Sequence, residues 1–123
     1  MKILTKDEFD TLPIHKQTCC VKFPNGDKLW LKEGKLHRLD GPAVDHADGD
    51  KFWYKNGKLH RLDDPAVEYT DGEKRWYKEG LPHNTNGPAI EFADGTKEYW
   101  LEGIPYTSFN EWYAIINNLE KFI

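Results

Sequence analysis

Hydrophobic and polar positions recur along this chain with a period of 23 residues. Successive units begin at Pro24, Ala47, Thr70 and Ala93, and the fourth unit is shorter than the others. One position of each unit is always aromatic, and it is occupied by Trp30, Trp53, Trp76 and Tyr99. Matched units of this kind predict a repeat array in which each unit contacts mainly its neighbours.

Each unit contains two turn signals separated by eight residues. The first signals are Asn25-Gly26, Asp48-Gly49, Asp71-Gly72 and Asp94-Gly95. Such dipeptides favour a two-residue type I′ turn. The second signals are Glu33-Gly34, Asn56-Gly57, Glu79-Gly80 and Glu102-Gly103. Each unit is therefore expected to be an antiparallel β-hairpin with a short third strand, joined to the next by a loop such as residues 39–42.

The turn lengths predict which side chains share a face of the sheet. A two-residue first turn places Val44 opposite Trp53, Val67 opposite Trp76 and Ile90 opposite Tyr99. A two-residue second turn places Trp30, Trp53 and Trp76 opposite His37, His60 and His83. The valines would then lie on the tryptophan face, and Leu29, Leu31, Phe52, Tyr54, Tyr77 and Trp100 would lie on the other. Both faces would mix apolar and charged residues, as expected of a single twisted layer.

The two ends of the chain depart from the repeat and predict helical caps. Thr5 and Glu8 have the spacing of a capping box, so a short helix is expected over residues 6–11, ended by Pro13. Ser108 and Glu111 have the same spacing, and an apolar stripe follows at Phe109, Trp112, Ile116, Leu119 and Ile123. This second helix is expected either to cover the last hairpin or to bind in a groove of a partner protein.

The predicted fold is all-β: about four antiparallel hairpin repeats in one twisted sheet, with a short N-terminal helix and a C-terminal capping helix. We expect one domain over residues 1–123, divided into an N-terminal cap at 1–20, repeats at 21–106 and the helix at 107–123.

Composition narrows the classes of function. The chain has 123 residues, a net charge of −4 and no apolar run long enough to span a membrane. Charged residues in the first eight positions argue against a signal peptide, so a cytoplasmic location is expected. A pI near 5.7 argues against general nucleic-acid binding. The adjacent Cys19 and Cys20 are expected to be reduced thiols on opposite faces of a strand, the alternative being a vicinal-dithiol switch.

The segment Asn56–Arg61, which reads NGKLHR, and the segment Asp40–Val44, which reads DGPAV, resemble a MORN-type repeat. This HRxDGPA variant is similar to repeats in small proteins of bacteria and their phages, and the resemblance spans residues 21–106. Asp64, Pro82 and Asn84 depart from the pattern. The resemblance implies a scaffold or binding surface and no reaction.

Catalysis is not expected, because the chain has one serine and no nucleophile motif, phosphate loop or metal-ligand spacing. The histidines His37, His60 and His83 lie one repeat apart, on the order of 10 Å, so they cannot share a metal ion. They are expected to stack on tryptophan and to hydrogen-bond the backbone. Neither a cofactor nor a metal is expected.

The candidate binding residues are aromatic and basic. They are Trp30, Trp53, Trp76, Tyr99, Lys51, Lys55, Lys74, Lys78, His37, His60, His83, Arg38 and Arg61. Lysines on either side of an aromatic ring suit a nucleotide or another small anion, whereas tryptophan and tyrosine suit a protein partner. Arg38 and Arg61 precede Asp40 and Asp63, so they either close the loops or join an anion-binding strip.

The expected function is non-enzymatic binding of a protein partner that the chain blocks. Because of the resemblance, a phage-encoded inhibitor of a host defence factor is favoured. The alternatives are sequestration of a nucleotide or anionic small molecule, and scaffolding within an immunity pair. The oligomeric state stays open.

The repeat organisation predicts that one unit can be removed whole. Deletion of residues 47–69 should leave a shorter folded array, because each unit contacts mainly its neighbours. Circular dichroism and thermal melting measure this. Loss of all β-type signal at ordinary temperature would contradict a repeat array.

Overall fold

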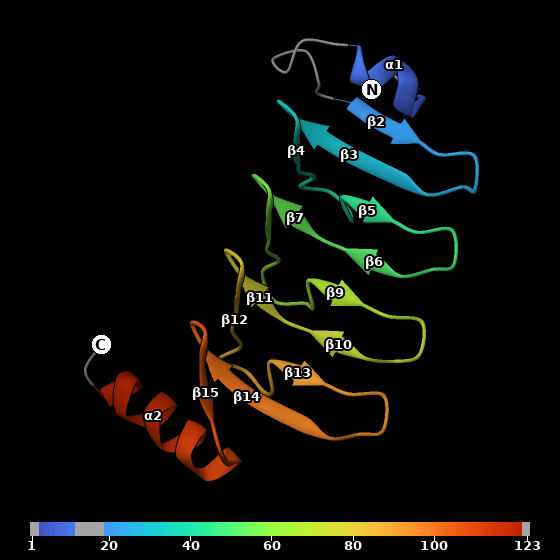
Figure 1. The fold of residues 1–123 in the computed structure, drawn as a ribbon. Helices are drawn as coiled ribbons and strands as arrows, with labels where there is room; N and C mark the ends of the chain where they lie inside the picture. The colour runs from blue at the N-terminus through green and yellow to red at the C-terminus, as the bar shows by residue number, and fades with distance from the viewer. Residues whose placement is uncertain (1–2, 12–18, 122–123) are drawn as a thin grey trace.

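A computed structural model describes residues 3–11 and 19–121 and consists mainly of one sheet of eleven strands (Figure 1). At the N-terminus, β1 (Ile3–Leu4) pairs in parallel with β2 (Cys19–Lys22), and α1 (Lys6–Asp10) lies between them in the chain. The Thr5 hydroxyl accepts the Glu8 N–H at 3.2 Å, which confirms the first capping box. Pro13 lies outside the described residues.

The repeats supply the remaining strands. They are β3 (Lys28–Lys32), β4 (Lys35–Leu36), β5 (Val44–Asp45), β6 (Lys51–Phe52), β7 (Tyr54–Lys55), β8 (Lys58–Leu59), β9 (Val67–Glu68), β10 (Lys74–Arg75), β11 (Tyr77–Lys78), β12 (Leu81–Pro82), β13 (Ile90–Glu91), β14 (Lys97–Leu101) and β15 (Ile104–Tyr106). The main sheet has the order β1-β2-β3-β5-β6-β9-β10-β13-β14-β15, with β4 as its eleventh strand paired to β3 outside this order, while β7-β8 and β11-β12 form separate ladders. The predicted all-β fold with two helices is confirmed.

The predicted geometry of the first turn is wrong by one residue. Gly49 has a φ of 105°, whereas Asp48 is not among the residues with positive φ. The His46 N–H donates to the Asp50 carbonyl at 3.0 Å, and the Gly49 N–H donates to the His46 carbonyl at 2.9 Å. These bonds define a three-residue loop with glycine in the left-handed position, the common alternative to type I′.

This longer turn changes the partners across the sheet. Val44 pairs with Phe52, Val67 with Arg75 and Ile90 with Glu98, instead of with the tryptophan and tyrosine column. A shift of one residue turns a side chain to the opposite face. The Val21, Val44, Val67 and Ile90 column therefore lies away from the tryptophans, and the predicted composition of the two faces is wrong.

The second turn has the predicted two-residue geometry. Asn56 and Gly57 both have positive φ, 51° and 81°, as a type I′ turn requires. Tyr54 pairs with Leu59, and the His60 N–H donates to the Trp53 carbonyl at 3.0 Å. Glu33, Glu79 and Glu102 adopt the same positive φ in their own turns.

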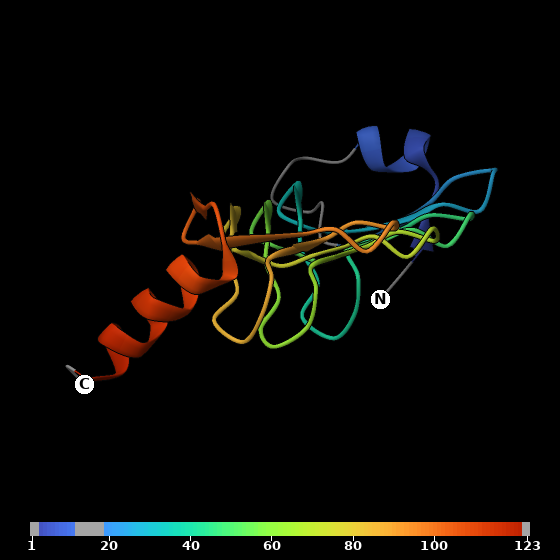
Figure 2. The same cartoon turned by 90° about the horizontal axis from the view of Figure 1, so that it is seen from below.

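The two sides of the sheet differ in what covers them. Figure 2 shows the connecting loops on one side and the tips of the short hairpins on the other. We call the first side the loop face and the second the open face. Trp30 lies on the loop face, because Arg38 lies over its ring and donates to the Pro42 carbonyl of the connecting loop. Leu29 and Leu31, which alternate with Trp30 along β3, lie on the other face. Ala43, Ala66 and Ala89, each directly before the strand that follows a loop, are fully buried.

The C-terminal helix α2 (Phe109–Lys121) contacts the array through its first turns. The Ser108 hydroxyl accepts the Glu111 N–H at 3.2 Å, while the Glu111 carboxylate accepts from Thr107. Trp112 is 4% exposed and lies 5.2 Å from the Tyr99 ring. The helix then extends away from the sheet (Figures 1 and 2). The side chains of Leu119 and Ile123 lie outside the description.

Trp112 is expected to stabilise the end of the array. Trp112→Ala should lower the free energy of unfolding by about 3 kcal/mol or more, because it empties a buried site and removes the 3.2 Å bond from the indole Nε1 to the Asn84 carbonyl. Urea unfolding measures the loss. Tyr113→Ala is the control, since Tyr113 is 49% exposed on the same helix. Equal effects of the two substitutions would contradict this assignment.

Candidate binding surfaces

Arginine lies over the indole ring in the first two repeats, where histidine was expected. The guanidinium carbons of Arg38 and Arg61 lie 3.9 Å from the ring centroids of Trp30 and Trp53. At this distance the contact is a close cation–π interaction. One face of each of these two rings is therefore already occupied within the chain.

The same arginines close the loops between the strands. Arg38 donates to the Pro42 carbonyl at 3.2 Å, and Arg61 donates to the Pro65 carbonyl at 3.1 Å. Asn84 replaces arginine in the third repeat, and its amide donates to the Pro88 carbonyl at 2.9 Å. These contacts support the loop-closing interpretation.

The carboxylate partner of the arginine differs between the first two repeats. Arg38 pairs with Asp40 at 3.0 Å, as predicted. Arg61 pairs with Asp64 at 3.6 Å and with Glu68 at 3.3 Å, whereas Asp63 was expected. Asp63 has a φ of 72°. The departure at Asp64 thus changes the ion pair and leaves the bond to the proline carbonyl in place.

The histidine column joins consecutive repeats through the backbone. His37 Nδ1 accepts the Asn56 N–H at 2.9 Å, and His60 Nδ1 accepts the Glu79 N–H at 3.0 Å. His83 Nδ1 accepts the Glu102 N–H at 2.9 Å. Each bond requires an unprotonated Nδ1. The backbone bonding expected of these histidines is confirmed, and it uses one ring nitrogen of each.

The lysine column lies in a row of alternating charge. The register aligns, in order across the sheet, Lys28, Asp45, Lys51, Glu68, Lys74, Glu91 and Lys97. Lys51 forms an ion pair with Asp45 at 3.1 Å. Opposite charges on adjacent strands stabilise the sheet and neutralise one another. Lys51 and Lys74 each have a carboxylate on both sides, which weakens the case for an anion-binding strip.

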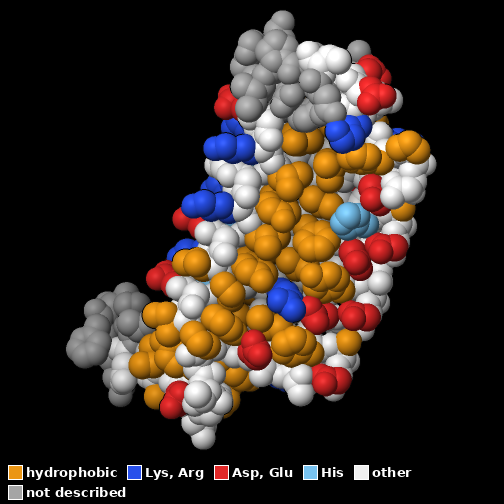
Figure 3. Space-filling view, viewed as in Figure 1, with side chains coloured by type: hydrophobic (Ala, Val, Ile, Leu, Met, Phe, Trp, Pro, Cys, Tyr) orange, Lys and Arg blue, Asp and Glu red, His pale blue; other side chains and the backbone are white. Residues whose placement is uncertain are grey.

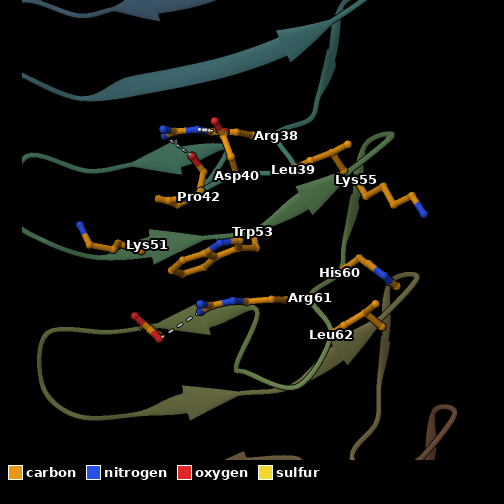
Figure 4. A pocket seen from close by; sticks show the side chains of 12 residues that line it. Arg38, Leu39, Asp40, Pro42, Lys51, Trp53, Lys55, His60, Arg61 and Leu62 are labelled. Carbon is orange, nitrogen blue, oxygen red and sulfur yellow. Dashed lines mark hydrogen bonds and ion pairs between the residues drawn. The ribbon is translucent and has the colours of Figure 1, made fainter.

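A groove of about 800 Å³ on the loop face brings together six of the predicted binding residues. They are Arg38, Lys51, Trp53, Lys55, His60 and Arg61 (Figure 4). Trp76, Lys78 and His83 line a smaller groove of about 200 Å³ one repeat further on. Neither groove includes Trp30, Tyr99, Lys74 or His37.

Two leucines that sequence reasoning missed flank the larger groove. Leu39 is 76% exposed and Leu62 is 72% exposed, and they occupy equivalent positions in consecutive loops. Figure 4 shows both on the segments that border the groove. The repeat contained a signal for them, because Leu39 and Leu62 directly follow His-Arg inside a loop, where an apolar side chain has no strand to pack in.

The open face carries a continuous apolar surface (Figure 3). Its centre is the column of Val21, Val44, Val67 and Ile90, which is 2–7% exposed. Leu29 and Phe52 pair with the three valines, whereas Ile90 pairs with Arg75 and Glu98. Phe52 makes edge-to-face contacts with His46 and Tyr69 at 5.6 and 5.7 Å between ring centroids. Arg75 interrupts this surface, and its charge is paired with Glu73 at 2.7 Å.

Other chemistry is limited within residues 3–11 and 19–121. No group of three or more His, Cys, Asp or Glu side chains there could hold a metal ion.

Cys19 and Cys20 are free and buried, and burial is the main cause that raises the pKa of each thiol. They pair with Leu31 and Trp30, on opposite faces as predicted. No helix in the described part of the chain is long and apolar enough to cross a membrane.

Comparison with known proteins finds no similar family model, no similar curated protein and no similar solved structure.

Acid should weaken the histidine bonds between repeats. Burial is the main cause that lowers the pKa of His37, with help from Lys32 and Lys55. Burial and Lys78 lower the pKa of His83, against an opposing effect of Glu102. Because the folded pKa lies below the unfolded value of 6.5, the stability is fully present above about pH 6.5. It is lost as the pH falls through that value towards the folded pKa.

Denaturant unfolding between about pH 7 and pH 5 measures this loss. A His37→Asn, His83→Asn variant is the matched control, because the amide oxygen can accept the same N–H without titrating. The variant should lose less stability than the native chain over this range. An identical pH dependence in both proteins would contradict the role of these histidines.

Proposed function

We propose that this chain is a non-enzymatic binding protein that holds and blocks a protein partner in the loop-face groove between the first and second repeats. The observation that carries the proposal is the pair of leucines, 76% and 72% exposed, on either side of the half-buried Trp53. Apolar side chains exposed to this extent around an indole and two arginines have the composition of an interface centre.

The charge of the groove indicates the kind of partner. Its lining contains four basic side chains, Arg38, Lys51, Lys55 and Arg61, and two acidic ones, Asp40 and Glu68. Three of the four basic side chains, Arg38, Lys51 and Arg61, already pair with carboxylates, so the remaining positive charge would steer the approach of an acidic segment of a partner more than it would hold it. The leucines would contact apolar side chains of the same segment.

The arrangement of the basic residues favours a protein over a nucleotide. Lys51 is paired with Asp45, and Arg61 is paired with Glu68, so part of the positive charge is already neutralised. Arg61 also covers one face of the Trp53 ring, which a stacked base would need. Sequestration of a nucleotide or anionic small molecule stays as the alternative outcome. Within the proposal, the partner is a host defence factor blocked by a phage-encoded protein, an expectation that comes from the resemblance.

Substitution of the exposed leucines tests the groove without disturbing the core. Leu39→Asp with Leu62→Asp should abolish capture of the partner from a host lysate, because it places two carboxylates where apolar contact is required. Leu81→Asp with Ile104→Asp is the matched control, since these residues are 48% and 58% exposed on hairpin tips away from the groove. Quantitative mass spectrometry of the captured proteins compares the variants with the native chain.

The same purified samples decide between the two classes of ligand. A protein retained by the native chain and the control, and lost by the leucine variant, would support the proposal. A stoichiometric nucleotide released on denaturation would overturn it in favour of the small-molecule alternative. Equal retention of every captured protein by both variants would exclude the groove as the binding site.

A further inference from the structure

The open face is an apolar sheet surface over which α1 lies only at the N-terminal end of the array (Figure 2), and the apolar part visible in Figure 3 has no second layer over it. Sheets normally bury such a face against another sheet or a helix. The described part of α2 cannot serve, because it leaves the array at the last hairpin (Figures 1 and 2). The column of Val21, Val44, Val67 and Ile90 is buried by its neighbours, so the accessible apolar surface is formed by half-buried side chains such as Leu29, Phe52, Tyr54 and Tyr77. A contiguous apolar surface of this kind marks an interaction site.

We propose that a second copy of this chain covers the open face, so that two sheets pack face to face as a two-fold symmetric dimer. This inference concerns the face opposite the groove and is independent of the proposed function. The occupant is identified by the distribution of charge around the apolar surface.

The two long rims of the open face have opposite charge. The rim formed by the first turns carries Asp27, Asp48, Asp50, Asp71, Glu73 and Asp94. The rim formed by the hairpin tips has a small excess of positive charge, with five lysines against three glutamates: Lys32, Lys35, Lys55, Lys58 and Lys78 against Glu33, Glu79 and Glu102. Lys78 is paired with Glu102 at 3.3 Å, and Lys55 and Lys78 also border the grooves of the loop face. Figure 3 shows red side chains along one edge of the apolar surface and blue ones along much of the other.

A two-fold axis parallel to the direction of repeat stacking places opposite charges against each other at both rims. Rotation about this axis turns the copies face to face and exchanges the two rims, so each acidic rim lies over a basic rim of the partner copy. The perpendicular in-plane axis would place acid over acid. Charge complementarity therefore selects one self-complementary arrangement, as an isologous interface requires.

The size of the apolar surface fits a weak, concentration-dependent dimer. Seven strands from β3 to β14, about 4.8 Å apart, span ~29 Å, and three residue columns about 7 Å apart span ~14 Å. The projected area is then about 400 Å² per copy, so the pair would bury roughly 800 Å² of apolar surface, to which the charged rims add. The two loop faces, and with them the two grooves, would point outward.

Light scattering coupled to size-exclusion chromatography tests the full-length chain. The native protein should elute with twice the 14.4 kDa mass of one chain. Tyr77→Lys, at a half-buried position on the open face that is equivalent to Tyr54 in the preceding repeat, should give a monomer with unchanged circular dichroism. Leu62→Lys, on the opposite face, should leave the dimer intact.

Substitution of exposed charged residues on the rims tests the dimer without changing the apolar surface. Lys35→Glu with Lys58→Glu should raise the dimer dissociation constant at least about tenfold, because like charges then face each other on both rims. Asp48→Asn with Asp71→Asn removes acidic charge and keeps the side-chain oxygens that accept the Asp50 and Glu73 N–H groups. When the two variants are mixed, a heterodimer should form, since the repulsion on both rims is relieved.

A native chain that stays at the monomer mass at every concentration tested would overturn the proposal. A native dimer that the lysine variant does not weaken would also overturn it, because the charged rims would then not face each other. Recovery of the heterodimer from the mixed variants would support the two-fold arrangement, and failure to form it would contradict that arrangement.

Discussion

The glycine of the first turn in each repeat decides which side chains share a face of this sheet. Gly26, Gly49, Gly72 and Gly95 adopt a left-handed conformation that residues with a β-carbon rarely take. The resulting three-residue loop moves the valine column away from the tryptophans, because a sheet alternates its side chains with a period of two. One face becomes mainly apolar, interrupted by Arg75 and Glu98. The other carries Trp30, Trp53 and Trp76, with Arg38 and Arg61 over the first two rings, and the alternating row of lysine and carboxylate side chains.

Stacking of the repeats depends on polar contacts that recur with the same period. The histidine Nδ1 atoms accept backbone N–H groups of the next repeat, and Asp27 and Asp50 accept the Ala47 and Thr70 N–H groups at 2.7 and 2.8 Å. No buried side-chain nitrogen or oxygen in the described residues lacks a hydrogen-bond partner. Such contacts orient each repeat on its neighbour, so thin apolar packing is sufficient to hold a single layer.

The two faces therefore suit different tasks. On the loop face, arginines and prolines close loops over the indoles and leave a groove with exposed Leu39 and Leu62 at its borders. On the open face, charge is confined mainly to the rims and the centre is apolar (Figure 3). We infer that the grooved face receives a partner protein and that the open face receives a second copy. The two proposals are compatible, because each uses one side of the same sheet.

The sequence by itself determined the number of repeats, the positions of all the turns, both helices and the all-β fold, since these follow from local turn chemistry, capping and periodicity. It also determined the pairing of Trp53 with His60, because Asn56-Gly57 admits a two-residue turn. Only the tertiary structure decided the register of the first hairpin, since Asp48-Gly49 is compatible with two loop lengths that differ by one residue. That difference, together with the folding of the loops onto one side, decided which columns meet and placed Leu39 beside Trp53. Contacts between residues of neighbouring repeats depend on the hairpin register and on the side to which the loops fold. No local sequence pattern specifies either of these.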